Sequence, residues 1–283
     1  GQIYYNSASG SFKAVTAGVG SWSSGGSLNT TRKALSGFGT QTAAIAAAGQ
    51  GGPSNTAQNS CEAYNGTNWT EVGEVNTAKV YRGNCGTQTA GLLVGGGPVT
   101  NDTEEWNGSS WTETANYPTN ITFPQQLGVQ TAAFVCGGNN NGPYVTATNT
   151  YNGTAFTGST AINTARAEGA AAGTTTAAIV AAGNASGGVV NSTEIWNGSS
   201  WTEVNELNTA RSLVGGSGTT STSMLVFAGS QNPTPYLAVT ESWNGTSWTE
   251  VADLATVRSA IGGSTNGSTA LALAFGGQTP PGL

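Results

Sequence analysis

The chain lacks histidine altogether and has few charges, with only 8% charged residues and 8 Lys plus Arg among 283 residues. The absence of histidine removes the usual general base, the Ser-His-Asp triad and the commonest metal ligand. So few basic side chains argue against nucleic acid as a partner, because affinity for the phosphate backbone comes largely from Lys and Arg. No apolar run approaches the roughly 20 residues that span a bilayer. We therefore expect no catalytic residues, no metal, no cofactor, no nucleic acid and no membrane insertion.

Aromatic residues and glycine are plentiful instead, with 8 Trp, 8 Tyr, 7 Phe and 43 Gly. Disordered chains usually combine few aromatics with a high net charge, whereas the formal charge here is only −6. The three cysteines, Cys61, Cys85 and Cys136, are widely spaced and odd in number. They are expected to be small buried hydrophobic residues, not a disulfide framework.

An internal repeat dominates the sequence. The segment Tyr64–Glu71 returns as Trp106–Glu113, Tyr151–Gly158, Trp196–Glu203 and Trp243–Glu250. The second aromatic of each copy is Trp69, Trp111, Phe156, Trp201 or Trp248, and Trp22 stands in the same phase. Successive steps from Trp22 are 47, 42, 45, 45 and 47 residues, which makes six repeats. Repeats of this length are typical of β-propeller blades.

Each repeat is predicted to form four short strands. In the fifth, these run from Arg211 to about Gly216, then over 224–227, 239–243 and 248–251, with Asn244-Gly245 as a tight hairpin turn. The pattern predicts an all-β, six-bladed β-propeller that uses the whole chain, 1–283, as one domain. The predicted blades cover 29–75, 76–117, 118–162, 163–207, 208–254, and 255–283 together with 1–28.

The last repeat contains only its first two strands before the sequence ends. We expect the N-terminal segment to supply the other two, through Gln2–Tyr5 and a strand near Phe12 or Trp22. Tyr5 with Phe12, and Trp22, both suit the aromatic positions, so the register stays open. Such a splice would leave no open blade edge.

The repeat resembles the kelch repeat. A basic residue is followed by an apolar strand ending in Gly-Gly, as in Leu92–Gly96 and Phe134–Gly138, and then by two aromatics such as Trp106 and Trp111. The Asn-Gly-Ser-Ser-Trp-Thr-Glu and Asn-Thr-Ala-Arg motifs are similar to kelch-like repeats in virion proteins of tailed, especially marine, bacteriophages. Gly1–Ser7 is also similar to a segment common in phage structural and fibre proteins. The resemblance implies a four-stranded blade and a place in a phage particle.

Charged residues recur at fixed positions. Residues whose numbers have a constant sum lie opposite each other on a hairpin, so Glu194 should face Glu203 beside the facing Trp196 and Trp201. Facing like charges are unfavourable unless a cation lies between them. A basic residue precedes each pair, which predicts structural charge triads of Arg32, Glu62 and Glu71; of Lys79, Glu104 and Glu113; of Arg166, Glu194 and Glu203; and of Arg211, Glu241 and Glu250.

The third repeat loses all three charges together, with Ile121, Asn149 and Gly158 at those positions. This joint loss favours the structural triad. The alternatives are a bound cation, or a glutamate pair for glycoside hydrolysis, and fourfold repetition speaks against catalysis because an active site is normally singular.

Irregular loops are the candidate binding residues. Tyr117, Asn140, Tyr144 and Tyr236 stand where the repeat is broken, in loops expected on one face of the propeller. Exposed Tyr and Asn suit recognition of a sugar or a protein. Loop drift without function is the alternative.

These observations predict a non-enzymatic virion protein of a phage, structural or adhesive in the manner of a tail fibre, located in the extracellular particle. Its expected partners are other virion proteins or a host-surface glycan, with assembly into a multimer within the particle. The alternative is a lectin-like, carbohydrate-binding propeller that is not viral.

Overall fold

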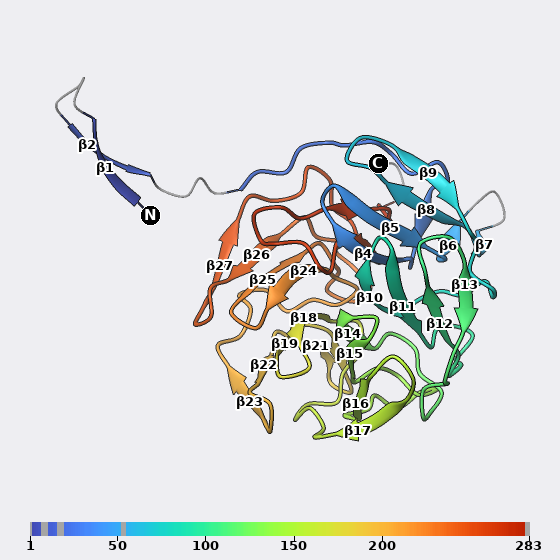
Figure 1. The fold of residues 1–283 in the computed structure, drawn as a ribbon. Helices are drawn as coiled ribbons and strands as arrows, with labels where there is room; N and C mark the ends of the chain where they lie inside the picture. The colour runs from blue at the N-terminus through green and yellow to red at the C-terminus, as the bar shows by residue number, and fades with distance from the viewer. Residues whose placement is uncertain (1, 7–10, 16–19, 52–54, 281–283) are drawn as a thin grey trace.

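The structure, a computed structural model, describes residues 2–6, 11–15, 20–51 and 55–280. The described residues form strands, turns and loops and contain no helix, and hence no helix that could cross a membrane. Five antiparallel sheets have four strands each, paired in chain order (Figure 1).

The first sheet consists of β4 (Ser36–Thr40), β5 (Ala43–Ala47), β8 (Cys61–Tyr64) and β9 (Trp69–Val72). The second consists of β10 (Gly83–Thr87), β11 (Ala90–Val94), β12 (Thr103–Trp106) and β13 (Trp111–Glu113). The third consists of β14 (Gln125–Val129), β15 (Ala132–Cys136), β16 (Thr148–Tyr151) and β17 (Phe156–Ser159). The fourth consists of β18 (Ala170–Thr174), β19 (Ala177–Ala181), β22 (Thr193–Trp196) and β23 (Trp201–Val204). The fifth consists of β24 (Gly215–Thr220), β25 (Ser223–Phe227), β26 (Thr240–Trp243) and β27 (Trp248–Val251). Each sheet lies within one predicted repeat.

Shorter strands complete the description. The C-terminal repeat contributes β28 (Gly262–Gly263) and β29 (Ala274–Phe275). Loop ladders are formed by β3 (Arg32–Lys33), β6 (Gln50–Gly51) and β7 (Thr56–Ala57), and by β20 (Asn184–Ala185) and β21 (Gly188–Val189). At the N-terminus, β1 (Gln2–Asn6) pairs with β2 (Ser11–Val15).

The outer hairpins have the predicted register. Trp196 pairs with Trp201 and Glu194 with Glu203, and the two indole rings lie 5.5 Å apart. The Asn197 side chain accepts the backbone N–H groups of the turn that follows, and Gly198 has a φ of +96°. Asn-Gly is therefore used here as a turn, because the Asn side chain caps the loop and glycine tolerates the left-handed conformation.

Neighbouring repeats are joined by their innermost strands. β4, β10, β14, β18 and β24 contact one another in chain order, and β28 contacts both β24 and β4. A backbone N–H after each second strand donates to a carbonyl at the start of the next repeat. These bonds, of 2.8–3.0 Å, run from Gly49 to Lys79, Gly96 to Ile121, Gly138 to Arg166, Gly183 to Arg211, Gly229 to Arg258, and Gly277 to Arg32. The last bond joins the C-terminal repeat to the first.

The second position of the Gly-Gly pair requires glycine for a local steric reason. At Gly49, with a φ of +100°, an added Cβ would lie 2.7 Å from the Leu35 Cβ. Only glycine allows the N–H to reach the next repeat at this close approach. The first position of the pair is less strict, since Ala48, Ala182 and Ala228 occupy it with φ near +60° (55°, 61° and 60°).

A second row of backbone bonds joins residues that lie two positions after the basic residue of each repeat, or after Ile121 in the third repeat. The residues there are Ala34, Tyr81, Phe123, Glu168, Leu213 and Ala260, all with φ between 51° and 65°. Their N–H groups donate to the preceding member's carbonyl in five of the six steps, at 2.9–3.2 Å, including Ala34 to Ala260. We call these six residues the entrance ring. The step from Glu168 to Leu213 carries no such bond.

The N-terminal segment differs from the expectation. β1 pairs with β2 and with no other described strand, so Gln2–Tyr5 and Phe12 do not extend the C-terminal sheet. Trp22 contacts the fifth repeat instead: its ring lies 5.1 Å from that of Phe227, in a cluster that also contains Ala272 and Ala274 of the last repeat. Of the two aromatic alternatives, Trp22 occupies the position between the fifth repeat and the last. Residues 1, 7–10 and 16–19 of this segment lie outside the described residues.

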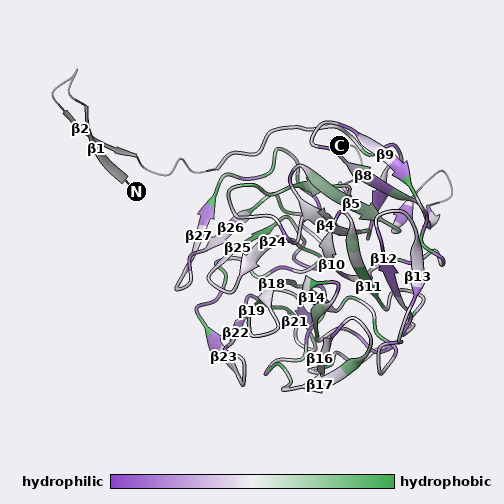
Figure 2. Cartoon of the chain, viewed as in Figure 1, coloured by the Kyte–Doolittle hydropathy of each residue, from purple (hydrophilic) through white to green (hydrophobic). Residues whose placement is uncertain are grey.

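The core lies between neighbouring sheets, not in one central mass. One cluster joins Phe38 and Ile45 of the first repeat to Leu93, Trp106 and Trp111 of the second. Figure 2 shows hydrophobic residues along β5 and β11 and hydrophilic residues on parts of β12 and β27. The hairpin tryptophans Trp106 and Trp111 therefore fix the second sheet against the first.

Candidate functional site

Buried ion pairs stand at the predicted basic positions of three repeats. Arg32 pairs with Glu62 at 2.7 Å, Arg166 pairs with Glu194 and Arg211 pairs with Glu241. All six side chains are at most 1% exposed. Burial lowers the pKa of Arg166 and of Arg211, and the partner glutamate offsets part of that effect. Each buried charge thus has a partner, which is the condition for tolerating charge in a protein interior.

The Asn-Thr-Ala-Arg motif also binds the same glutamates through its backbone. The backbone N–H of the motif asparagine donates to the second carboxylate oxygen, at 2.7 Å in Asn29 to Glu62, Asn163 to Glu194 and Asn208 to Glu241, and at 2.8 Å in Asn76 to Glu104. Each inner carboxylate is therefore bound by a cation and by the backbone.

The predicted triads are pairs, which corrects the expectation for the outer glutamates. The register is as predicted, with Glu241 opposite Glu250, but Glu71, Glu113, Glu203 and Glu250 are exposed. Each outer glutamate lies on the last strand of its sheet, where water hydrates the carboxylate. Among the described residues, Glu203 and Glu250 form no salt bridge but still act electrostatically on Arg166 and Arg211. No second cation is then required.

The second repeat differs from the other three in which basic residue binds its buried glutamate. Lys79 pairs with Asp102, and the pair with Glu104 is made by Arg82, which lies three residues further on. The predicted Lys79–Glu104 contact is therefore wrong. Lys79 holds the pKa of Asp102 below its usual value. The guanidinium of Arg82 thus takes the role towards Glu104 that Arg166 and Arg211 have towards their glutamates in other repeats, through its Nη1 atom.

In the third repeat, a neutral pair replaces the charges. The Asn149 side-chain amide donates to the Tyr117 hydroxyl at 2.7 Å, in a site where Ile121 is fully buried. Tyr117 is only 1% exposed, so the expectation that it is a binding residue is wrong. It lies four residues before Ile121, where the other repeats have Leu, Val or Ile in the same phase. That phase could have revealed its core position.

The three cysteines are buried and free, as expected. Burial raises the pKa of Cys61 to about 11 and that of Cys85 to about 12, so both thiols stay protonated at neutral pH. Within the described ranges, no cluster of three His, Cys, Asp or Glu residues could hold a metal ion.

The remaining predicted binding residues lie beside the entrance ring. Tyr144 and Tyr236 are half-buried and pair in loop bridges with Asn139 and Ser230. Glu168 acts electrostatically on Tyr144 and on Tyr81, and Tyr236 on Tyr81; burial first, and these charges second, raise the pKa of Tyr81. The loops of the third and fifth repeats therefore approach the ring from one face. Asn140 is also half-buried, its N–H bonded to the Pro143 carbonyl.

Three further side chains lie on this face and were not among the predicted binding residues: Tyr81, Phe123 and Glu168. Tyr81 and Phe123 stack with ring centroids 4.0 Å apart. Each of the three stands two residues after its basic position, in the left-handed conformation described above. A fixed offset in the repeat was the available signal, but nothing in the pattern says that this offset faces a common entrance.

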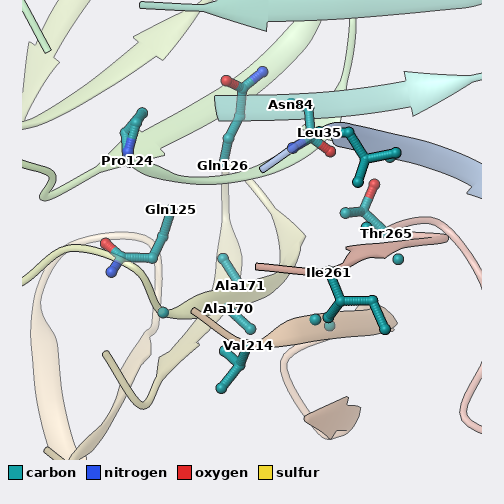
Figure 3. A pocket seen from close by; sticks show the side chains of 16 residues that line it. Leu35, Asn84, Pro124, Gln125, Gln126, Ala170, Ala171, Val214, Ile261 and Thr265 are labelled. Carbon is teal, nitrogen blue, oxygen red and sulfur yellow. The ribbon is translucent and has the colours of Figure 1, made fainter. Parts of the chain in front are cut away.

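A cavity of about 80 Å³ adjoins the entrance ring, and Figure 3 shows the side chains that line it. It is lined from six repeats, and in five of them by the residue that follows the ring residue: Leu35, Pro124, Gly169, Val214 and Ile261. The polar side chains of the lining include Asn84, Gln125, Gln126 and Thr265. Gln125 is satisfied by its neighbours once its amide is oriented to donate to the Cys136 carbonyl.

Asn266 ties together three repeats at the far end of the first strands. Its side chain donates to the Gly128 carbonyl at 3.2 Å and accepts from the Gly86 N–H at 3.4 Å, and its own N–H donates to the Gly39 carbonyl. Gly39, Gly86 and Gly128 close the β4, β10 and β14 hairpins. Asn266 thus connects the first strands at their far end, and the entrance ring lies at the opposite end of these strands.

No model of a known protein family matches the chain, and no curated protein matches it significantly.

Proposed function

We propose that the protein is a six-bladed β-propeller closed between its C-terminal repeat and its N-terminal segment. Two rows of inter-repeat backbone bonds support this, because each includes a bond from the first repeat to the last: Gly277 to Arg32, and Ala34 to Ala260. Closure without an open edge is how propellers protect short blades.

A side-chain hydrogen bond of Trp22 also supports closure. Its indole N–H donates to the Thr240 hydroxyl at 3.1 Å, as that of Trp248 donates to the Thr193 hydroxyl at 3.0 Å. Thr193 and Thr240 each begin the third strand of a repeat. Trp22 therefore relates to the fifth repeat as Trp248 relates to the fourth, which makes it the outer tryptophan of the sixth blade.

We further propose that this propeller is a non-enzymatic component of a tailed-phage particle, acting in structure or host adhesion. The kelch-like resemblance of the repeat supports the particle. The ion pairs support the absence of catalysis, because four inner glutamates are each bound by a cation and a backbone N–H. The partner is a host-surface glycan or a neighbouring virion protein, bound on the face of the entrance ring.

A lectin-like propeller outside a virus is the second candidate function. It is favoured by the aromatic side chains on one face, Tyr81, Phe123, Tyr144 and Tyr236, since stacked and half-exposed rings suit sugar faces. Mass spectrometry of purified particles, from cultures producing the phage whose genome encodes the chain, separates the two. Presence at stoichiometric amounts supports the virion component. Absence from particles, with retained glycan binding, supports the lectin.

Closure has its own test. Replacing Trp22 by Ala should lower the free energy of unfolding by about 3 kcal/mol, since it empties a site between two repeats. Deleting residues 1–26 should unfold the domain. Ser23→Ala, at the exposed neighbouring position, is the control. A Trp22→Ala protein that melts with the parent would overturn closure by this segment.

A further inference from the structure

The outer edge of the third sheet differs from the outer edges of the other four. The last strand of each sheet has one edge that pairs with no described strand (Figure 1). Such an edge is a template for pairing with another chain unless charged side chains obstruct it. β17 is the outer strand of the third sheet, and its sequence Phe-Thr-Gly-Ser carries no charge. The other four outer strands each carry an exposed glutamate two residues after the tryptophan, at Glu71, Glu113, Glu203 and Glu250.

Gly158, which stands at this glutamate position in β17, is not required by the fold of its own sheet. An added Cβ there would meet only the Asn149 Oδ1, at 3.9 Å, which is ordinary van der Waals contact. Its backbone does not have the left-handed conformation, and β16 pairs with β17 in unbroken register across it, so it forms no bulge. A glycine inside a strand otherwise marks the close approach of another backbone. Among the described residues, no strand approaches this edge.

The aromatic residue of β17 is also more accessible than its counterparts. The tryptophans that begin the other four outer strands are 6% exposed. Phe156 is only half-buried, with its ring centroid 5.2 Å from that of Tyr117 and 4.7 Å from that of Tyr151. β17 therefore combines a free backbone edge, a partly accessible aromatic ring and no charge that pairing would have to desolvate.

The distribution of charge favours a second copy of this chain as the partner of β17. The chain has a formal charge of −6. Two copies that met through any of the other four outer strands would bring glutamates close to glutamates, which is unfavourable. Two β17 strands related by a two-fold axis bring no charges together, and their glycines allow the two backbones to approach. Antiparallel pairing about such an axis continues the hydrogen-bond ladder of both sheets.

We propose that β17 is a dimerisation edge, at which two copies of the chain pair antiparallel through Phe156–Ser159 and join their third sheets into one continuous sheet. Four residues from each copy make a small interface, so we expect a weak dimer whose population rises with concentration. The inference does not depend on the virion assignment, because it rests on the comparison between repeats.

The test is sedimentation velocity over a concentration series from about 10 µM to about 300 µM, which gives the association constant. We expect the parent to form dimers. Gly158→Glu restores the residue of the other four repeats and places one carboxylate from each copy at the shared edge. It should weaken association at least about tenfold, by a factor that falls as salt is added.

Thr202→Glu is the matched control, because it adds the same charge at an exposed position of the outer strand β23 and should leave association unchanged. Circular dichroism verifies the fold of both variants. A parent that stays monomeric throughout the series would overturn the proposal and leave the edge to a different protein. Dimers that persist in Gly158→Glu would overturn it too, because the copies would then meet elsewhere. Growth beyond dimers would show that β17 meets a different surface of the next copy, which contradicts symmetric pairing.

Discussion

The third and fifth repeats fill the same internal slot with different chemistry. In the fifth, Arg211 and Glu241 form a buried ion pair. In the third, Ile121 fills the space of the arginine, and Asn149 bonds to the Tyr117 hydroxyl instead of a cation. The backbone frame is alike in both, since Gly138 and Gly229 donate to the following repeats in the same manner.

This comparison shows that the slot requires volume and satisfied polar groups, not charge. An ion pair needs Arg, Glu and a backbone N–H together, so losing one member strands another. The neutral version needs one hydrogen bond and an aliphatic side chain. Neither alternative tolerates a mixture, which explains why the positions of Ile121 and Asn149 change together in the third repeat.

The largest expected effect comes from breaking the ion pair of the fifth repeat. Arg211→Met should lower the free energy of unfolding by about 3–5 kcal/mol, because Glu241 would stay buried without a cation. Urea denaturation measures the loss. Adding Glu241→Gln should recover part of it, whereas Glu250→Gln, at the exposed position, should change stability by less than about 1 kcal/mol in either background. Strictly additive effects of Arg211→Met and Glu241→Gln would show that the two side chains are not coupled.

Transplanting the ion pair into the third repeat sharpens the comparison. Ile121→Arg alone should cost about 3 kcal/mol, because it buries a cation without a carboxylate. Combining it with Asn149→Glu and Tyr117→Leu should cost less than Ile121→Arg alone. The measurement is a mutant cycle by urea denaturation. A triple variant less stable than Ile121→Arg would mean that the third repeat cannot accommodate the charged solution.

The neutral pair itself is tested by removing one atom. Tyr117→Phe should cost about 1–3 kcal/mol, since the buried Asn149 amide loses its acceptor. Thermal denaturation gives the difference, and Tyr144→Phe, on a half-buried loop side chain, is the control. Equal melting of Tyr117→Phe and the parent would show that Asn149 has another partner.

The smallest effect concerns Glu168, a carboxylate without a cation. Burial raises its pKa above the ordinary 4.5, so the folded protein holds this proton more tightly than the unfolded chain does. The ionised form therefore destabilises the fold above the folded pKa, and this penalty disappears as pH falls below about 4.5. Glu168→Gln should be slightly more stable than the parent at pH 7 and equal to it in acid. A constant difference across pH would contradict this account.

The repeat predicted much of the local structure because hairpin chemistry is encoded in short segments. Asn-Gly turns, facing tryptophans and facing glutamates follow from spacing alone, and the register of Glu194 with Glu203 confirms it. Spacing could not tell which glutamate is buried. That depends on the strand's place in the sheet, since Glu203 lies on the solvated last strand. Nor could it predict that Arg82 replaces Lys79 at Glu104, because three residues of offset reach the same slot only in the folded backbone.

The sequence by itself determined the repeat, the strands and the turns, because these depend on side chains close together along the chain. Only the tertiary structure decided that Tyr117 is a core residue bonded to Asn149, that Trp22 packs against Phe227, and that residues of six repeats line one cavity. Each of these contacts joins residues from different repeats or from different strands of one repeat. Their proximity arises from how the sheets pack against one another, which no local pattern specifies.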